Sequence, residues 1–420
     1  MEESPPQAVP VLIPGEFLPR YRTLRMKIDL AATREFRAGG LSVAAIEPRL
    51  STPPRETREE VARLADVTRW LREGVSPEEF LAERQREFEG VAAHRESREL
   101  SELLASARSC GAIAPAPTGW GRPTAGVPHF AVPKVEGGFR LISDMRCINS
   151  FFSPPSFTLA GLRTLPQLAR KFASKLDLKS AFWQMPLSDA LARRTLFQWE
   201  GSWWCWKVLP MGLTISPFVF QCFSQAWVDR WRLLGIVCAA YLDDVIVFAD
   251  TVEEHCASVE RVVLDLLETG VHLSAKKAFV APYVILPYLG VLVHLPERAL
   301  SVPAVKIGKL RRVAGALAAD GRARGSVSAK ALSRFLGAVA FACFVYRPAV
   351  IFRGALDFVL SGASQGACRV AASEEALADL DWWADEATQY LSDLYPFAPL
   401  PHHLVTLDAA VVTTDASATG

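Results

Sequence analysis

Two short apolar runs rich in β-branched residues flank a pair of adjacent carboxylates in residues 237–248, VCAAYLDDVIVF. Runs of this kind predict buried strands, so Asp243 and Asp244 are expected at a tight hairpin turn. Neighbouring anions repel each other, and their useful property is a set of oxygen ligands for a hard cation such as Mg²⁺. An isolated Asp-Asp pair is more often a plain turn, but the strands on both sides and the preceding Tyr241 favour a functional site.

Helical periodicity is clearest over residues 251–269, where a Thr-x-x-Glu capping box precedes an apolar stripe and a glycine follows. His255 on this helix is expected to be a solvated surface residue. A second helix is predicted from Ser97 to Arg108. A third is expected to begin in the Ser-Pro-Glu-Glu sequence at Ser76.

Two more segments combine apolar patterns with candidate chemistry. In residues 172–187, FASKLDLKSAFWQMPL, a short strand ends at Asp177 and an aromatic residue, Phe182, follows. In residues 209–221, LPMGLTISPFVFQ, a glycine-containing loop leads into a helix. Ser216 is the expected N-cap of that helix, with the next residue, a proline, at the first helical position.

These three blocks, in this order, resemble the palm motifs of a reverse transcriptase: a first aspartate, a glycine loop before a Ser-Pro helix, and a Tyr-x-Asp-Asp box. Four further segments are similar to the same family, and they extend the resemblance over about residues 98–420. They are VPHFAVPKVEGGFRLISDMRCIN (the fingers hairpin), LFQWEGSWWCWKV (the hairpin before the glycine loop), HLSAKKAF with YLG (the lysine motif and primer grip), and VVTTDASATG (the first strand of an RNase H domain).

The resemblance implies an α+β fold, a right-hand polymerase with fingers, palm and thumb, in which an antiparallel palm sheet is backed by helices. The expected division of the chain is a helical or partly disordered leader (1–97), fingers and palm (98–300), a basic thumb or connection (301–369), an acidic connection (370–409) and the start of an RNase H-like domain (410–420). Asp415 matches the first metal-binding carboxylate of that last domain. One carboxylate cannot hold two Mg²⁺ ions, so these 420 residues are not expected to degrade RNA.

By the same resemblance, Asp177, Asp243 and Asp244 form the catalytic and metal-binding site. Asp177 and Asp243 are expected to ligate two Mg²⁺ ions directly, with Mn²⁺ as a substitute, while Asp244 tunes the charge of the site. Two such ions stabilise the attacking and leaving oxygens of an in-line phosphoryl transfer. A purely structural role for three clustered carboxylates is disfavoured, because burying them without a cation is costly.

The expected dNTP pocket contains Lys134, Arg140, Phe182, Met211 and Gly212. Lys134 and Arg140 match the family positions that hold the incoming triphosphate, and Asp144, Arg146 and Asn149 belong to the same fingers block. A generic phenylalanine is most often a core residue. The spacing of Phe182 after Asp177 matches the family's sugar gate, an aromatic plate that fills the space of a ribose 2′-hydroxyl. Met211, before the loop glycine, places the chain on the retrotransposon side of the family.

Charge is segregated along the chain although its net value is only +1. Residues 301–369 carry 11 Lys or Arg and 2 acidic residues, whereas residues 370–420 carry 9 acidic residues and no Lys or Arg. The basic segment is either a solvated helical face or a surface that grips nucleic-acid phosphates. Its position after the palm favours the second interpretation. Residues expected to contact nucleic acid are Tyr241, Lys277, Leu289, Gly290, Lys309, Arg311 and Arg312.

The predicted function is therefore an RNA-directed DNA polymerase of a retroelement. Its expected partners are an RNA template, a DNA primer or RNA–DNA hybrid, dNTPs and other retroelement-encoded proteins. Two alternatives stay open: a non-catalytic, nucleic-acid-binding relic of a retrotransposon, and an RNA-dependent RNA polymerase, against which Phe182 and the RNase H start both argue. The segments SVPAVKIGKLRRVAGAL, SAKALSRFLGAVAFACFVYRP and ADLDWWADEA are similar to DIRS-like retroelements, which use a tyrosine recombinase. Trp382 and Trp383 in the last segment are equally well explained as core aromatics.

Composition fits an intracellular protein of the cytoplasm or nucleus. Half of the residues are apolar, and the eight cysteines have no zinc-site spacing and are expected to be reduced thiols. The longest apolar run, residues 336–346, is far shorter than the ~20 residues needed to cross a bilayer. The N-terminus MEESPPQAVP has no basic start and no apolar core, so secretion is not expected.

Overall fold

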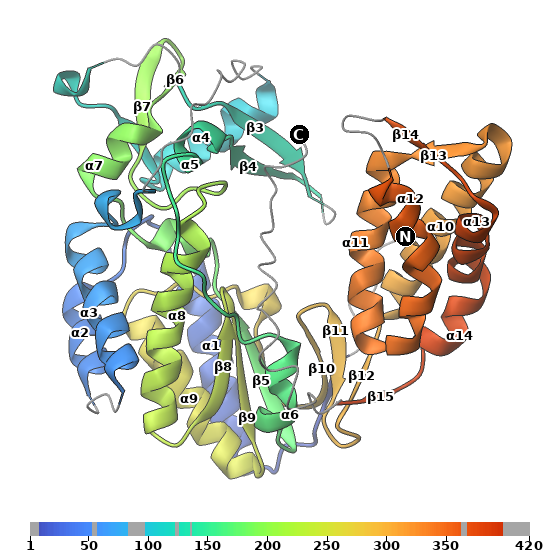
Figure 1. The fold of residues 1–420 in the computed structure, drawn as a ribbon. Helices are drawn as coiled ribbons and strands as arrows, with labels where there is room; N and C mark the ends of the chain where they lie inside the picture. Colours follow the sequence, from blue (N-terminus) through green and yellow to red (C-terminus); the bar gives the residue numbers. More distant parts are fainter. Residues whose placement is uncertain are drawn as a thin grey trace. The chain divides into compact units, whose positions relative to one another are not determined.

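The computed structural model describes residues 8–52, 57–82, 97–121, 126–134, 137–362 and 368–397. These residues form two compact units, each described by itself below. The larger unit holds residues 13–161 and 174–281, and the smaller unit holds residues 8–12, 162–173 and 282–397. Helices and antiparallel strand pairs occur in both units, which confirms the expected α+β class (Figure 1).

The larger unit combines helices with three groups of strands. Its helices are α1 (Leu18–Thr33), α2 (Val43–Ser51), α3 (Arg58–Glu73), α4 (Arg98–Ser109), α5 (Arg146–Asn149), α7 (Asp189–Ala192), α8 (Ser216–Leu233) and α9 (Val252–Glu268). Its strands are β2 (Ile113–Pro115), β3 (His129–Pro133), β4 (Phe139–Ser143), β5 (Phe172–Asp177), β6 (Phe197–Trp199), β7 (Ser202–Trp206), β8 (Val237–Tyr241) and β9 (Asp244–Ala249). Strand β5 begins in the smaller unit and ends in the larger one.

Strands β8 and β9 form the predicted hairpin, and β5 lies on the other side of β9. Tyr241 pairs with Asp244, so the loop of the hairpin contains only Leu242 and Asp243. The apolar residues of these strands are buried, as their β-branched sequence predicted. Helices α8 and α9 lie beside the hairpin in Figure 1 and contribute their apolar faces to the same core.

The N-terminal helices belong to this core, although the sequence predicted a separate leader up to residue 97. Ile28 of α1, Ile46 of α2 and Val67 of α3 are fully buried in the hydrophobic cluster that includes α8 and α9. The predicted boundary therefore does not separate two compact units. The charged sequence concealed this arrangement because some of its charges are paired with α8 and α9, as Arg20 is with Glu260 and Arg63 with Asp229.

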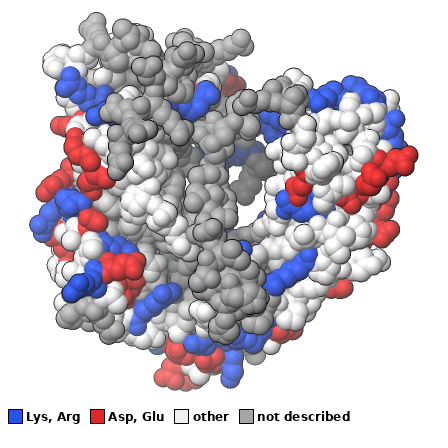
Figure 2. Space-filling model, viewed as in Figure 1, with Lys and Arg blue, Asp and Glu red and all other residues white. Residues whose placement is uncertain are grey.

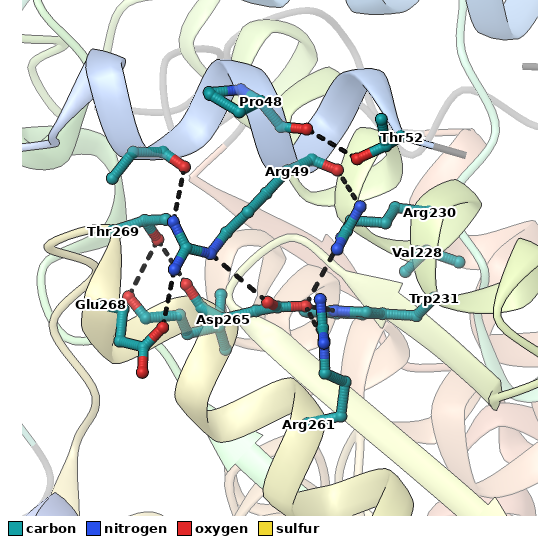
Figure 3. Close-up of polar contacts among 12 residues, drawn as sticks. Pro48, Arg49, Thr52, Val228, Arg230, Trp231, Arg261, Asp265, Glu268 and Thr269 are labelled. Carbon is teal, nitrogen blue, oxygen red and sulfur yellow. Dashed lines mark hydrogen bonds and ion pairs between the residues drawn. The ribbon is translucent and has the colours of Figure 1, made fainter. Parts of the chain in front are cut away.

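One buried cluster shows this pairing (Figure 3). The Asp265 carboxylate of α9 accepts a hydrogen bond from the Trp231 indole at 3.1 Å and forms ion pairs with Arg49 of α2 at 3.6 Å, Arg230 of α8 at 3.5 Å and Arg261 at 3.0 Å. Arg230 also donates to the Arg49 carbonyl. The cluster joins three helices through a carboxylate that is only 2% exposed.

Several local predictions are confirmed. Ser97 caps α4, and Thr251 caps α9 by accepting a hydrogen bond from the Glu254 N–H at 3.1 Å. The Glu254 carboxylate accepts from the N–H of Asp250 rather than from that of Thr251, so the capping box is shifted by one residue. The two predicted hairpins are also present: Gly137-Gly138 lies between β3 and β4, and Glu200-Gly201 lies between β6 and β7.

Three local predictions are wrong. His255 is fully buried, because α1 covers its side of α9, and its two ring nitrogens lie 2.7 Å from Tyr21 Oη and 2.7 Å from Ser174 Oγ. Ser216 is the first helical residue of α8 rather than its cap, and its hydroxyl donates to the Pro210 carbonyl. The sequence at Ser76 forms only a short 3₁₀ turn, Glu78–Phe80, whose Phe80 is buried.

The smaller unit combines an antiparallel strand group with a helical part. Its strands are β1 (Val9–Pro10), β10 (Phe279–Tyr288, whose first residues lie in the larger unit), β11 (Val291–His294), β12 (Ala299–Ser301), β13 (Ser326–Ser328), β14 (Arg369–Ala371) and β15 (Tyr395–Pro396). Its helices are α6 (Leu165–Leu168), α10 (Ala304–Arg324), α11 (Ala329–Val345), α12 (Gly354–Ser361), α13 (Glu374–Asp381) and α14 (Ala387–Leu391), with a π-helical turn at Trp382–Glu386.

Helix α10 packs against α11, α13 and α14, so the predicted boundary at residue 370 lies inside one helical unit. Trp382 and Trp383 are core aromatics here: the Trp382 ring stacks on Phe352 with a centroid distance of 3.9 Å, and the Trp383 indole donates to the Phe352 carbonyl at 2.6 Å. Residues 398–420, with Asp415, lie outside the described residues. In the part of the chain that is described, no helix has the length and apolar character needed to cross a membrane.

Candidate active site

Two strand ends bring Asp177 and Asp243 together. Strand β5 ends at Asp177, and the next N–H, that of Leu178, donates to the Asp243 carbonyl at 2.8 Å. The Asp177 carbonyl in turn accepts from the Ser274 N–H at 2.8 Å. These backbone bonds fix the main-chain positions of two aspartates that are far apart in the sequence.

Side chains of helix α8 support the loop of the β8–β9 hairpin by hydrogen bonds to its backbone. Leu242 has a φ of +52°, a left-handed conformation that is unfavourable for a branched side chain. Its N–H donates to Gln221 Oε1 at 2.8 Å, and its carbonyl accepts from the Ser224 hydroxyl at 2.8 Å. Gln221 also donates to the Ala240 carbonyl at 3.3 Å. These bonds hold the loop in its strained conformation and so fix the direction of Asp243.

Burial and mutual repulsion disfavour the ionised carboxylates. Burial is the main cause that raises the pKa of Asp177; Lys277 opposes this rise and Asp244 adds to it. Burial also raises the pKa of Asp243 from 3.8 to about 6, and the carboxylates of Asp244 and Asp177 add to the rise. The site therefore carries more negative charge than its protein surroundings neutralise, and it would favour a cation.

Two lysines supply part of the missing positive charge. Lys175, on β5, places Nζ 3.0 Å from Asp244 Oδ1, and its side chain is only 14% exposed. Lys277 places Nζ 3.4 Å from Asp177 Oδ2, but its side chain is 55% exposed and reaches in from the solvent side. Asp244 is thus held by a buried counter-ion, whereas Asp177 is met by a lysine that can move away.

The chemistry of these side chains fits a divalent cation. Asp177 and Asp243 offer hard oxygen ligands on adjacent chain segments, and Mg²⁺ typically uses one or two carboxylates with water and substrate phosphates. Among the described residues, no three His, Cys, Asp or Glu side chains are grouped closely enough to hold a metal ion by themselves. That all three aspartates are metal ligands therefore stays a prediction, and the contact with Lys175 favours the supporting role expected for Asp244.

Lys134 and Arg140 lie on the β3–β4 hairpin. Lys134 follows the last residue of β3, and its N–H donates to the Gly138 carbonyl at 2.9 Å. Arg140, on β4, pairs with Val132. Both side chains are exposed, as triphosphate ligands would need to be. At the base of the hairpin, an ion pair of 2.6 Å with Arg146 holds the pKa of Asp144 below its usual range.

Met211 and Gly212 form the glycine loop against the base of this hairpin. The Met211 carbonyl accepts from the Ser143 N–H at 3.3 Å. Gly212 has a φ of +103°, and a Cβ atom at this position would overlap the Ser143 carbonyl oxygen, so only glycine fits. The Asn149 amide donates to the Gly212 carbonyl at 2.8 Å and accepts from the Thr214 N–H at 2.8 Å. The predicted fingers block and the glycine loop are therefore joined directly.

Phe182 lies in a short 3₁₀ turn after β5 and is half-buried. Its ring meets Phe220 of α8 edge to face, with a centroid distance of 5.9 Å. This contact supports one side of the ring and leaves part of it accessible, which is compatible with both a gate and a packing role. Tyr241, the last residue of β8, is also half-buried, and burial raises its pKa.

The remaining predicted contact residues are in the smaller unit. Leu289 and Gly290 form the turn between β10 and β11, with φ values of +45° and +86°. Lys309, Arg311 and Arg312 are all exposed on α10, and Arg311 also donates to the Ala384 carbonyl at 2.8 Å. Figure 2 shows both signs of charge on the drawn face of this helical part, and Arg322 pairs with Asp381. The charges that are segregated in the sequence are thus partly mixed on the surface.

No role was predicted from the sequence for Lys175, Gln221 or Ser224. Lys175 was recognisable as a charged residue in an apolar strand, on the same face as Asp177 because it lies two positions before it. Gln221 and Ser224 are polar residues at a spacing of i and i+3 on the otherwise apolar side of α8. Buried polar residues at such positions need hydrogen-bond partners, and here the partner is the backbone of the β8–β9 hairpin.

Residues 132–293 match the family described as reverse transcriptase (RNA-dependent DNA polymerase). This part of the chain is thus similar in sequence to reverse transcriptase domains. The chain is 32% identical over 162 residues to the Pro-Pol polyprotein of simian foamy virus type 1, a match that covers 38% of this chain and 14% of the polyprotein. It is 31% identical over 150 residues to the genome polyprotein of petunia vein clearing virus (isolate Shepherd), covering 35% of this chain and 7% of that protein.

The chain also has the expected polymerase fold. A foamy viral protease–reverse transcriptase in complex with double-stranded DNA is similar with a TM-score of 0.60 and 18% identity, over 94% of this chain and 63% of that one. The same viral protein in complex with an RNA/DNA hybrid gives a TM-score of 0.57 and 18% identity, over 93% of this chain and 48% of that one. The chain thus spans less than two thirds of these structures and only a small part of the viral polyproteins.

Proposed function

We propose that the chain is an RNA-directed DNA polymerase that adds dNTPs to the 3′ end of a primer. The observation that supports this most directly is the backbone bond from the Leu178 N–H to the Asp243 carbonyl, which brings the buried Asp177 and the half-buried Asp243 together in the part of the chain that matches reverse transcriptases. Their raised pKa values fit the same role, because groups arranged for cation binding repel one another when no cation compensates them.

Asp177 and Asp243 are the proposed ligands of Mg²⁺, with Mn²⁺ as a substitute. When bound, two such ions would lower the pKa of the primer 3′-hydroxyl and neutralise the triphosphate and the leaving pyrophosphate. The protein positions these charges: β5 and the β8–β9 loop hold the carboxylates, α8 supports the loop, and Lys175 keeps Asp244 beside them as a supporting anion. Lys134 and Arg140 are proposed to bind the triphosphate from the fingers hairpin.

The proposed partners are an RNA template and a DNA primer, or their hybrid. The related foamy viral protein has been observed in complexes with double-stranded DNA and with an RNA/DNA hybrid. The proposed nucleic-acid contacts of this chain are Tyr241, Lys277, the Leu289–Gly290 turn and the exposed cations of α10, such as Lys309 and Arg312.

Primer extension tests the proposed activity. The purified chain is incubated with a DNA primer on an RNA template, dNTPs and Mg²⁺ or Mn²⁺, and products are resolved by length. Extension is expected from the wild type and not from Asp243→Asn. Wild-type protein that is folded by circular dichroism, binds the hybrid and yet adds no nucleotide would support the alternative of a non-catalytic, nucleic-acid-binding relic.

Phe182 is the proposed sugar gate, which would make the substrates deoxynucleotides. Phe182→Val removes the aromatic plate but keeps an apolar side chain against Phe220. The variant is expected to incorporate ribonucleotides ~10- to 100-fold better relative to dNTPs, since a steric exclusion is lost. Single-nucleotide incorporation of dNTP and rNTP on the same primer measures the ratio, and an unchanged ratio would assign Phe182 to packing alone. Strong rNTP use by the wild type would instead favour an RNA-dependent RNA polymerase.

We also propose a DIRS-like retroelement as the origin of the chain, on the strength of the sequence segments after residue 300. The viral relatives support a retroelement in general and do not distinguish this subtype. The genomic sequence downstream of residue 420 provides the test. An RNase H segment followed by a tyrosine recombinase would support the proposal, and an integrase in that place would contradict it.

A further inference from the structure

Lys306 lies directly over the turn between β10 and β11. It is in the first turn of α10, and its Nζ is 4.2 Å from the centre of the Phe341 ring on α11. A Cβ atom added to Gly290 would overlap Lys306 Nζ and would lie 3.2 Å from Phe341 Cζ. The turn, the ammonium group and the ring are therefore packed together within the smaller unit.

This position is unfavourable for an isolated ammonium group. A cation in the first turn of a helix is repelled by the positive end of the helix dipole. The residue as a whole is exposed, but partial desolvation of its ammonium group, together with the nearby Lys309, lowers the pKa of Lys306. No ion pair between Lys306 and a carboxylate is found in the described ranges. The favourable contact that the structure does provide is the face of the Phe341 ring, a cation–π interaction.

The turn between β10 and β11 has a strained backbone, which a supporting side-chain contact would stabilise. Leu289 and Gly290 both have left-handed φ values, of +45° and +86°, and a leucine at this conformation is strained. Gly290 lets the ammonium group and the ring approach closely because it has no side chain. A charged group and an aromatic ring from two different helices thus close over a strained turn.

We propose that Lys306 is a positioning residue: its ammonium group, held over Phe341, locks the Leu289–Gly290 turn to helices α10 and α11, so that the turn and the helices act on a bound nucleic-acid strand as one body. The nucleic-acid part of this inference rests on the proposed function. The lock itself is a property of the protein alone and can be measured without any ligand.

A direct bond from Lys306 to a backbone phosphate is the competing explanation, and Phe341 separates the two. A phosphate bond needs only the ammonium group, so Phe341→Leu would leave it intact. The lock needs both partners, so Lys306→Met and Phe341→Leu should each break it, and the double variant should lose no more than either single one. Lys306→Arg should keep the lock, because a guanidinium also stacks on an aromatic face. Lys27→Gln, at an exposed position on α1, controls for the loss of a lysine.

Amide hydrogen exchange of the ligand-free full chain tests the lock. A cation–π contact of about 1 kcal/mol corresponds to an approximately fivefold faster exchange of the Leu289, Gly290 and Val291 amides in Lys306→Met, in Phe341→Leu and in the double variant alike. Lys306→Arg and Lys27→Gln should exchange like the wild type. Unchanged exchange in both single variants, or changes that simply add in the double variant, would overturn the proposal.

Primer extension then tests its consequence. Both single variants are expected to lose about fivefold in kcat/KM for dNTP, again without further loss in the double variant. A loss confined to Lys306→Met, with a salt dependence of hybrid binding lower by about one unit, would assign a phosphate bond instead and overturn the lock. If the wild type shows no extension at all, the proposed function fails, while the exchange experiment still decides whether the lock exists.

Discussion

The β8–β9 hairpin of the larger unit and helix α10 of the smaller unit both carry residues that the sequence marked for chemistry, but they fix those residues differently. In the hairpin, backbone bonds to Asp243 and Leu242 determine where the carboxylates lie. On α10, the backbone is regular, and the role of each cation depends on what its long side chain meets. Lys309, Arg311 and Arg312 are all exposed, and of these three Arg311 donates a hydrogen bond to the Ala384 carbonyl.

This difference explains why a short motif predicts the geometry of a turn well and the contacts of a helical surface poorly. A tight hairpin with two loop residues has few conformations, so the order of residues in the motif nearly determines the geometry. A lysine or arginine on a helix has several rotatable bonds, and the same sequence position can bind a phosphate, a carbonyl or only water. Substitutions in the hairpin should therefore act on the reaction, and those of Lys309, Arg311 and Arg312 on affinity or stability.

The largest difference in activity is expected between substitutions of two aspartates in the candidate active site. Asp177→Asn should reduce primer extension by at least ~10³-fold, equivalent to ~4 kcal/mol, because it removes a proposed metal ligand. Asp244→Asn should cost less, ~10- to 100-fold, because Asp244 is paired with Lys175 and supports the site from outside the metal ions. Single-turnover rates at saturating dNTP measure both. Asp29→Asn, in an exposed ion pair on α1, is the matched control. Equal losses in the two variants would make Asp244 a ligand as well.

A second effect should come from the support under the hairpin loop. Gln221→Leu leaves the Leu242 N–H without its acceptor, and an unsatisfied buried donor costs ~1–3 kcal/mol. The loop is then free to relax from its strained φ, and kcat should fall ~10- to 100-fold while circular dichroism stays native. Ser224→Ala removes only the bond to the Leu242 carbonyl and should cost less. A Gln221→Leu variant with unchanged kcat would show that the turn holds itself.

The same residues show how much of the fold and of the candidate site could be predicted from the sequence. It predicted the hairpin, Asp177, the glycine loop and the capped helices, because each is encoded by local pattern and turn chemistry. It misplaced His255 at the surface, since the helix that buries it, α1, lies far away in the sequence and has no strong apolar stripe. It also gave no role to Lys175 and Gln221, because their partners are known only once β5, α8 and the hairpin have been brought together.

A third prediction concerns stability and uses the pKa of Asp243, raised from 3.8 to about 6, chiefly by burial. The folded protein holds this proton more tightly than the unfolded chain, so metal-free stability should fall as pH rises from about 4 to 6 and stay low above that. Asp243→Asn removes the penalty and should stabilise the metal-free protein by ~2 kcal/mol at pH 7, with no gain at pH 4.

Urea denaturation in EDTA at both pH values measures this difference. Adding Mg²⁺ should narrow it at pH 7, because the ion binds the folded wild type and not the unfolded chain. The substitution would thus abolish the reaction and stabilise the fold, as is typical where function requires an unfavourable charge cluster. A wild type that is more stable than Asp243→Asn in EDTA at pH 7 would contradict the charge argument.

The smallest effects are expected on α10, where the contacts of the side chains divide the predicted cations into two kinds. Lys309 and Arg312 are exposed, so Lys309→Gln and Arg312→Gln together should lower the slope of log affinity against log salt for an RNA–DNA hybrid by about 2, one released counter-ion for each charge. Arg311→Gln should change the slope less and the melting temperature more, because it breaks the bond that links α10 to the Ala384 carbonyl. Filter binding at several salt concentrations and thermal denaturation give the two quantities for each variant. If all three positions changed the slope equally and none changed the melting temperature, the basic segment would act as a diffuse cationic surface. The hydrogen bond from Arg311 to Ala384 would then make no difference to nucleic-acid binding.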